Sequence, residues 1–321
     1  MDPLSDILTL LRPAGYGFRG LDAAGDWALS FARAEGVLCF AIEKGSCWLR
    51  VVDAGEPVHL QPGDVVLMTR GYEVRLYSSD GAESRDAAGF LSGVPAGHVA
   101  TINGGGECSG IGGFFGLQGW RAMDLLAAVP AVVHVRSDAS RTALYVGVQR
   151  LMGELREPRA GSDLIAGHLA QALLVEAFRA HLEHAQAGEG WLAALAVPTL
   201  RRALTAMHAD VARRWTLRDL AAAAGMSRSG FAAHFERVTG ETPIAYLTRW
   251  RMFIAADRLA ASRLPLGTVA ASVGYESESA FGAAFKRVMH VSPLRYRTGA
   301  SRTPGLMPPA SPRHPPAGFA P

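Results

Sequence analysis

A pattern that occurs twice near the C-terminal end constrains the fold of this 321-residue chain more than any other feature. Residues 217–238 and 269–288 each combine a stretch of small residues, a glycine, a serine and two phenylalanines four positions apart. Each copy predicts a helix that ends near Gly225 or Gly274, a serine that caps the next helix, and a second helix. This arrangement is typical of the helix-turn-helix motif, whose second helix enters the DNA major groove. The repeat therefore predicts a sequence-specific DNA-binding region.

The helical period divides the second helix of each copy into a buried face and an exposed face. Residues at positions i, i+4 and i+7 predict the buried face: Phe231, Phe235, Val238, Phe281, Phe285 and Val288. The exposed positions, the second cap and nearby basic residues form the candidate DNA-binding set. Its members are Arg228, Ser229, Ala232, Ala233, Arg237, Arg249, Arg251, Ser277, Ser279, Gly282, Ala283, Lys286, Arg287 and Arg297. Its basic members are expected to contact phosphates, which fix the register but carry little sequence information.

The charge distribution also favours a nucleic-acid partner. Residues 1–197 contain 15 Lys/Arg and 22 Asp/Glu, a net charge of −7. Residues 198–299 contain 15 Lys/Arg and 7 Asp/Glu, a net charge of +8. Phosphates attract a basic module, so the repeat lies in the part of the chain where DNA would bind.

Length and composition favour two folded domains, since 49% of the residues are hydrophobic and 19% are charged. Residues 1–135 contain short strand-like runs separated by glycines, which predicts an antiparallel barrel or sandwich. After Ser140, helical spacing predicts two helices that either form a dimer seam or pack against their own barrel. The expected divisions are a sensor domain at 1–185, a linker at 186–197, a DNA-binding domain at 198–299 and a disordered proline-rich tail at 300–321.

The lengths of the apolar runs and the number of cysteines indicate the cellular compartment of the protein. No apolar run approaches the roughly 20 residues that span a bilayer, and residues 1–6 lack the basic region of a signal peptide. Cys39, Cys47 and Cys108 are odd in number and form no CxxC motif, which favours reduced thiols in a cytoplasmic protein. These cysteines are either redox sensors, with the Cys108 pKa lowered by loop amides, or inert small core residues.

Beyond these signals, residues 198–298 resemble the DNA-binding domain of AraC/XylS-type transcriptional regulators. The segments that carry the resemblance are 221–235, 273–287 and 292–297. The resemblance implies that both recognition helices enter successive major grooves, roughly 34 Å apart. It places base reading at Ser229, Ala232 and Ala233 and at Ser279, Gly282 and Ala283. Because these side chains are small, Arg228, His234 or the shape of the DNA is expected to carry more of the specificity.

The run at residues 45–67 is similar to the cupin-type sensor domain that precedes some AraC-family modules. Together the two resemblances imply an α+β multidomain protein. A cupin-like antiparallel β-barrel with a helical linker or dimerisation region would precede an all-α double helix-turn-helix domain. Metal-binding cupins need clustered histidines, but this chain has no HxH motif, and His59 and His98 are far apart in sequence. We therefore expect neither a metal nor another cofactor.

The sensor domain also offers candidate effector sites. An apolar ligand within the barrel would lie near Phe40, Trp48 and Tyr72. The expected function is a DNA-binding transcriptional regulator that responds to a small molecule or to a redox signal, and not an enzyme. Its expected partners are double-stranded DNA, an unknown effector, RNA polymerase and a second copy of the chain, with no membrane. The alternatives are a cupin-type enzyme and a protein-interaction module with alanine-rich helices.

Overall fold

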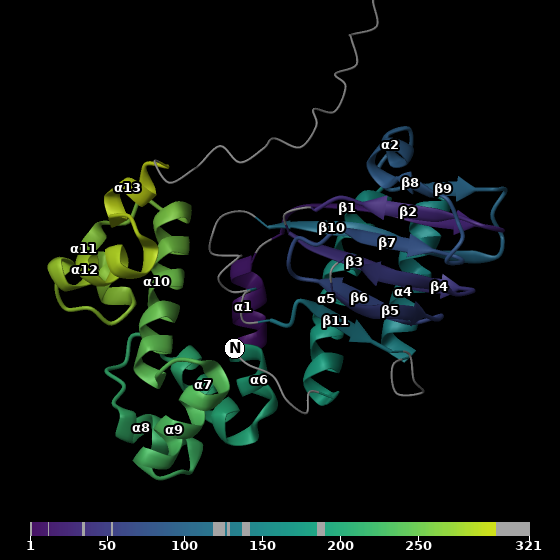
Figure 1. The fold of residues 1–321 in the computed structure, drawn as a ribbon. Helices are drawn as coiled ribbons and strands as arrows, with labels where there is room; N and C mark the ends of the chain where they lie inside the picture. The colour runs from purple at the N-terminus through teal and green to yellow at the C-terminus, as the bar shows by residue number, and fades with distance from the viewer. Residues whose placement is uncertain are drawn as a thin grey trace, which may run out of the picture. The chain divides into compact units, whose positions relative to one another are not determined.

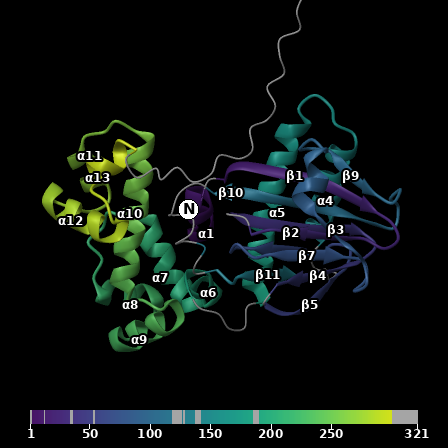
Figure 2. The ribbon, with the colours of Figure 1, turned by 45° about the horizontal axis from the view of Figure 1, so that its top comes forward.

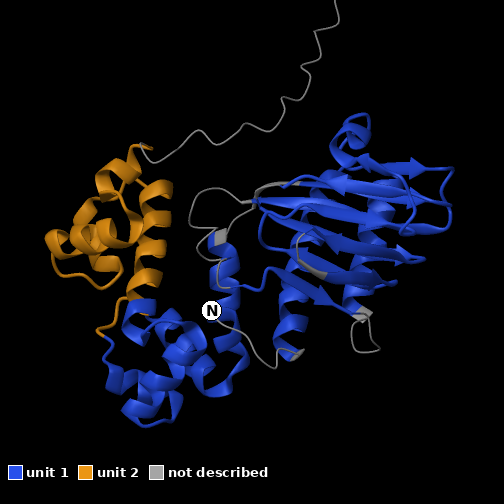
Figure 3. Ribbon diagram, in the orientation of Figure 1, with its two compact units in different colours: residues 1–210, 215–246 blue, residues 211–214, 247–321 orange. Residues whose placement is uncertain are grey.

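The computed structural model describes residues 2–11, 13–33, 36–52, 54–117, 126, 129–136, 142–184 and 190–299 (Figure 1). The predicted tail at 300–321 lies outside these ranges, and so do residue 185 and residues 186–189 of the expected linker. The chain divides into two compact units, which Figure 3 distinguishes by colour. One unit comprises residues 1–210 and 215–246, and the other comprises residues 211–214 and 247–321.

Two β-sheets form the N-terminal part of the first unit (Figures 1 and 2). The six-stranded sheet has the order β11-β6-β3-β10-β1-β9, and the five-stranded sheet has the order β5-β4-β7-β2-β8. The strands are β1 (Pro13–Ala23), β2 (Ala28–Phe31), β3 (Val37–Lys44), β4 (Cys47–Val51), β5 (Ala54–Leu60), β6 (Val65–Met68), β7 (Val74–Tyr77), β8 (Ser84–Asp86), β9 (Val99–Ile102), β10 (Cys108–Leu117) and β11 (Val132–Val135). The strand-like runs predicted at residues 37–42, 47–52, 57–60 and 65–68 thus correspond to β3, β4, β5 and β6.

Side chains from both sheets fill one core, which includes Leu29, Phe40, Leu49, Val66 and Leu76. Strand β4 alternates between buried and exposed residues, as expected for a strand with one covered face. Strand β3 is buried along six consecutive residues because helix α4 covers its other face. The core between the sheets therefore holds the domain together.

The β-rich cupin domain is confirmed, but its sheets are not closed into a barrel. Among the described strand pairs, none joins the six-stranded sheet to the five-stranded one. Nor is the pairing wholly antiparallel, because β9 runs parallel to β1 and β8 runs parallel to β2. Strand β8 leads directly into α2 (Ala87–Ser92), which precedes β9. Alternation along a strand indicates which face is buried, but it carries no information about which distant strand pairs with it.

Helices α4 (Thr142–Arg156) and α5 (Ser162–His184) lie on one side of the six-stranded sheet (Figures 1 and 2). Helix α4 contacts β1, β3 and β10, while α5 contacts β11. At the end of α4, both terminal nitrogens of Arg156 donate to the carboxylate of Glu43, at 2.7 and 2.5 Å. The helices thus pack against their own sheet, which was one of the two alternatives that the sequence left open. The dimer seam stays a prediction.

Three further helices of this unit pack together beside the first helix-turn-helix: α1 (Pro3–Leu11), α6 (Trp191–Ala196) and α7 (Pro198–Ala209). The described part of the expected linker is not an open spacer. Trp191 is 2% exposed and Leu195 is 4% exposed, and α6 packs on α7 and on α9, the helix of residues 228–239. Burial of these apolar side chains explains why the segment folds as a helix.

His208 of α7 joins three segments of this unit. Its side chain is fully buried, with Nδ1 3.2 Å from a carboxylate oxygen of Asp6 and Nε2 2.9 Å from the hydroxyl of Tyr246. Burial lowers the pKa of this imidazole, and the contact with Asp6 opposes that shift only in part. A neutral histidine therefore ties α1 and α7 to the first turn of α10 (Pro243–Ala261).

Candidate nucleic-acid interface

The first helix-turn-helix consists of α8 (Leu217–Ala224) and α9 (Arg228–Thr239). Thr216 caps α8 in a reciprocal capping box with Asp219. Gly225 ends the helix with a φ of 70°, a left-handed conformation that glycine adopts without steric strain. The Ser227 hydroxyl then accepts a hydrogen bond from the backbone nitrogen of Gly230 at 3.2 Å and starts α9.

Two phenylalanines fix the orientation of α9. Phe231 and Phe235 are fully buried, and their ring centroids are 5.6 Å apart. The ring of Phe235 also meets the ring of Tyr246 edge-on at 5.8 Å. Val238, predicted on the same face, is only half-buried. The aromatic residues therefore set which face of α9 points outward.

The second helix-turn-helix repeats this arrangement with α11 (Leu266–Ser272) and α12 (Glu278–Met289). Gly274 has a φ of 82°, and the Ser277 hydroxyl accepts from the backbone nitrogen of Ala280 at 3.2 Å. Phe281 and Phe285 are fully buried. The ring of Phe285 packs edge-on against Tyr296 of α13 (Pro293–Arg297), at a centroid distance of 5.6 Å. Val288, like Val238, is half-buried.

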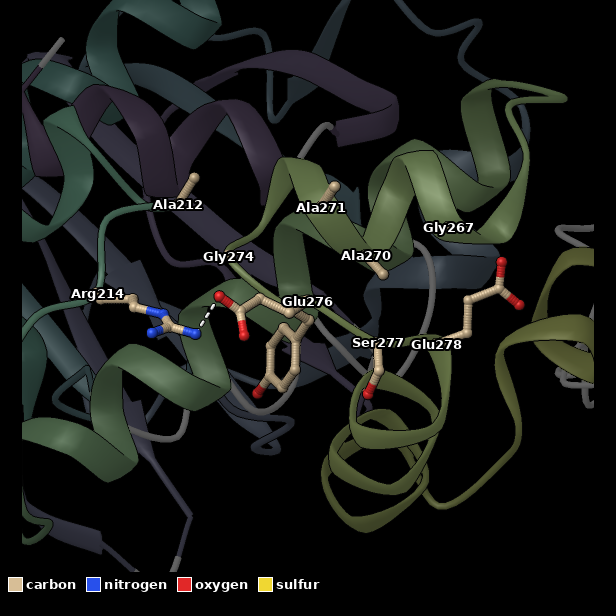
Figure 4. Close-up of a pocket in the computed structure, with 10 residues that line it drawn as sticks. Ala212, Arg214, Gly267, Ala270, Ala271, Gly274, Glu276, Ser277 and Glu278 are labelled. Atoms are coloured by element: carbon tan, nitrogen blue, oxygen red, sulfur yellow. Dashed lines mark ion pairs between the residues drawn. The ribbon is translucent and has the colours of Figure 1, made fainter.

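Residues 211–214 lie against the turn of the second motif (Figure 4). Arg251 donates from Nε to the carbonyl of Val211 at 2.8 Å and from a terminal nitrogen to the carbonyl of Arg213 at 2.7 Å. Arg214 forms an ion pair with Glu276 at the edge of the shallow hollow that Figure 4 shows. Both members of this ion pair are well exposed, so it adds little stability. The two hydrogen bonds of Arg251 therefore join this segment to α10.

The exposed faces of α9 and α12, which we call the recognition faces, lie opposite the buried rings. Most of the predicted DNA-binding residues are exposed on or beside these faces: Arg228, Ser229, Ala233, Arg237, Ser277, Ser279, Ala283, Lys286 and Arg287. Ala232 and Gly282 are partly covered. The guanidinium of Arg237 lies 2.7 Å from Nδ1 of His234 on the same helix. Each helix therefore brings its own predicted contact residues together.

Three arginines of the candidate set are already engaged within the protein. Arg251 binds the two carbonyls named above, and Arg297 donates to the carbonyl of Leu264 at 2.6 Å. The guanidinium of Arg249 lies 5.8 Å from the ring centre of Phe253. These internal bonds use only some of the guanidinium donors of Arg251 and Arg297, so their phosphate-contact interpretation stays a prediction. The charge alone did not distinguish an internal arginine from a free one.

A cupin family model matches residues 2–183, and a helix-turn-helix domain model matches residues 220–299. An AraC-like transcription regulator of Streptomyces lividans is 40% identical over 300 residues, which cover 92% of this chain and 98% of the relative. The chain belongs to the AraC family of transcription regulators. The HTH-type transcriptional regulator AlkR of Acinetobacter baylyi is 32% identical over 305 residues, which cover 92% of this chain and 99% of AlkR.

As a member of this family, the protein is a DNA-binding transcriptional regulator with a cupin-like N-terminal domain, and double-stranded DNA is its partner.

Within the described parts of the chain, every helix is too short or too polar to cross a lipid bilayer. The described residues also contain no group of three or more His, Cys, Asp and Glu side chains that is arranged to hold a metal ion.

The three predicted ligand-binding residues of this AraC-family protein do not converge. Phe40 is 2% exposed within the core between the sheets, and Tyr72 packs partly against that core. Trp48 lies on the outer face of β4, where it is 38% exposed and its ring lies tilted against that of His59, with the centroids 4.6 Å apart. The prediction that Trp48 lines an interior site is wrong, because side chains alternate across a strand and Cys47 and Leu49 take the inner positions.

The two recognition faces differ at the residue that follows each serine cap. The first motif presents Arg228 and the second presents Glu278 at this position, and both are exposed. The carboxylate of Glu278 lies beside the start of α11, because a Cβ on Gly267 would be 2.8 Å from Oε1. The candidate set omitted Glu278, although the sequence places it on the exposed side of the second recognition helix, at the position that Arg228 holds in the first.

Proposed function

We propose that this AraC-family regulator reads its operator by inserting α9 and α12 into the major groove, with Arg228 as the main polar contact of the first motif. One observation supports this most strongly. Both recognition faces are built on fully buried phenylalanine pairs, so their exposed residues are held in fixed orientations within the basic region of the chain. Arg237, Lys286 and Arg287 are exposed and would contact phosphates.

Salt dependence of binding tests the electrostatic part of this proposal. The full chain should bind duplex fragments from its own upstream region with an affinity that falls linearly in log–log form as salt rises. Counterions released from phosphates produce that slope. Binding should also be weaker on a shuffled duplex of the same composition. Salt-independent affinity, or equal affinity for the native and shuffled duplexes, would refute the proposal.

Replacing Arg228 with alanine should separate base reading from phosphate contact. If the guanidinium pairs with a guanine, affinity should fall by about 1–3 kcal/mol and preference should relax at one base position. If it contacts only phosphate, affinity should fall evenly across sequences and the salt slope should decrease by about one. Competition binding with single-base operator variants measures both outcomes.

Arg85→Ala is a matched control, because Arg85 is an exposed arginine on β8 of the sensor domain. It should leave affinity, base preference and salt slope unchanged. If Arg228→Ala behaves in the same way as this control, Arg228 is a solvated surface residue and is not part of the DNA-binding site.

The remaining parts of the proposal concern the sensor domain and the partners. We propose that the cupin domain conveys a small-molecule or redox signal and that the protein has no catalytic activity, which agrees with its relatives being named as regulators. We also propose a homodimer, since Leu164 and Ile165 of α5 are 64% and 40% exposed. RNA polymerase is the further partner proposed if the protein activates transcription.

A further inference from the structure

Two cysteines from different sheets meet at one end of the cupin domain. Cys47 is the first residue of β4 in the five-stranded sheet, and Cys108 is the first residue of β10 in the six-stranded sheet. The register of β3 and β10 pairs Lys44 with Ser109, which brings the β3–β4 turn beside the start of β10. The backbones approach so closely that a Cβ on Gly45 would lie 2.9 Å from the Cα of Cys108.

The two thiols are neighbours in one core. Both side chains belong to the core between the sheets, where Cys47 is 1% exposed and Cys108 is 7% exposed. The thiols lie close enough for each to shift the pKa of the other. Disulfide formation requires this kind of proximity, because two distant cysteines cannot be joined without backbone movement.

We propose that Cys47 and Cys108 form an oxidisable dithiol site, which a two-electron oxidant of the hydroperoxide class converts into an intramolecular disulfide. This inference rests on the redox form of the signal proposed for the cupin domain and names its residues, but it does not depend on DNA binding. The disulfide would link two sheets that no described strand pair joins. This link would lie beside the loop of residues 103–107, which directly precedes Cys108.

The chemistry of the site balances with the hydroperoxide as oxidant. The Cys108 thiolate attacks the terminal oxygen of the hydroperoxide, the O–O bond breaks, and the alkoxide leaves and takes up the thiol proton as an alcohol. The resulting sulfenic acid is attacked at sulfur by Cys47, the S–O bond breaks, and hydroxide leaves with the Cys47 proton as water. Two electrons pass from the thiols to the O–O bond.

The surroundings of Cys108 suit the role of attacking thiol. The neighbouring Cys47 thiol lowers the pKa of Cys108, and the thiolate is the reactive form. Cys108 follows the segment Gly104-Gly105-Gly106-Glu107, in which all three glycines have positive φ. Around Gly104 and Gly106 a Cβ would meet open space, so these two loop positions are not covered by other parts of the domain.

Cys39 provides an internal control within the same domain. It is buried on β3, and burial raises the pKa of its thiol to about 12. A protonated thiol in this position is a poor nucleophile. We therefore expect Cys39 to stay reduced under conditions that oxidise the pair.

Thiol labelling of the full chain tests the proposal. The purified protein is treated with hydrogen peroxide, denatured, labelled with N-ethylmaleimide, and analysed by intact mass and peptide mapping. Of the three free cysteines, only Cys39 should remain labelled, a Cys47–Cys108 peptide should appear, and dithiothreitol should restore all three labels. Cys39→Ser should still form the disulfide. Cys47→Ser, checked for folding by circular dichroism, should stop at a Cys108 sulfenic acid that dimedone traps.

The unmodified chain alone decides the outcome if a variant fails to fold. Retention of all three labels after peroxide would overturn the proposal. A disulfide that includes Cys39, or one between two chains, would overturn it as well. Because the readout is chemical, failure of DNA binding would leave this result unaffected.

Discussion

Replacing Phe285 with alanine should destabilise the second helix-turn-helix by about 3–5 kcal/mol, because truncating a buried phenylalanine removes its burial and leaves a cavity. Phe285 is fully buried and packs on both Phe281 and Tyr296. DNA affinity should be lost because the motif unfolds, so the loss should follow the unfolding transition measured by urea denaturation. Phe235→Ala should behave in the same way in the first motif, where the ring is equally buried.

Lys286→Ala is the matched control for Phe285→Ala. Lys286 is the next residue on α12 and is exposed. It should change the free energy of unfolding, measured by urea denaturation, by no more than the roughly 0.5 kcal/mol that is usual for a surface substitution, while DNA affinity and the salt slope decrease. A Phe285→Ala protein that keeps its stability but loses DNA binding would show that the buried and exposed faces have been assigned the wrong way round.

Replacing Gly274 with alanine should destabilise the second motif by about 2–5 kcal/mol. The left-handed φ of 82° imposes strain of roughly 1–2 kcal/mol on a residue with a Cβ. In addition, the new Cβ would lie 2.5 Å from the carbonyl oxygen of Ala212, which is backbone and cannot turn aside. Overpacking of this kind adds roughly 1–3 kcal/mol. Urea denaturation and operator affinity should therefore both report a large loss.

Gly225→Ala is the natural comparison, since Gly225 is the turn glycine of the first motif and has a φ of 70°. Its nearest neighbour to a new Cβ is the tip of the Arg202 side chain, at 3.2 Å. Because that tip can move, only the strain of roughly 1–2 kcal/mol should remain. Equal losses at the two glycines would contradict the close approach of residues 211–214 to the second turn.

The helix-turn-helix motifs were predictable because their signals are local. The capping serines, Gly225 and Gly274, and the phenylalanines four positions apart each act within one or two helical turns. The structure keeps all of these features in their predicted places. What the pattern did not reveal was that Arg251 and Arg297 turn inward, because backbone carbonyls distant in sequence receive their hydrogen bonds.

The sensor domain was predictable only in part because its decisive contacts are distant in sequence. Strand runs such as Val65–Met68 were read correctly from their β-branched and apolar residues. The parallel pairing of β9 with β1 and the outward position of Trp48 depend on the sheet as a whole. The proximity of Cys47 and Cys108 likewise depends on both sheets, and neither residue has a local motif that predicts it.

Selection from a randomised duplex library by the full chain tests the central claim most directly. Two recognition faces that enter successive major grooves predict an enriched sequence with two clusters of preferred bases, separated by about one helical turn of 10–10.5 base pairs. Arg228→Ala should relax one cluster and leave the other intact. Recovery of sequences with no enrichment over the starting library, or with a single cluster that Arg228→Ala does not change, would contradict the account.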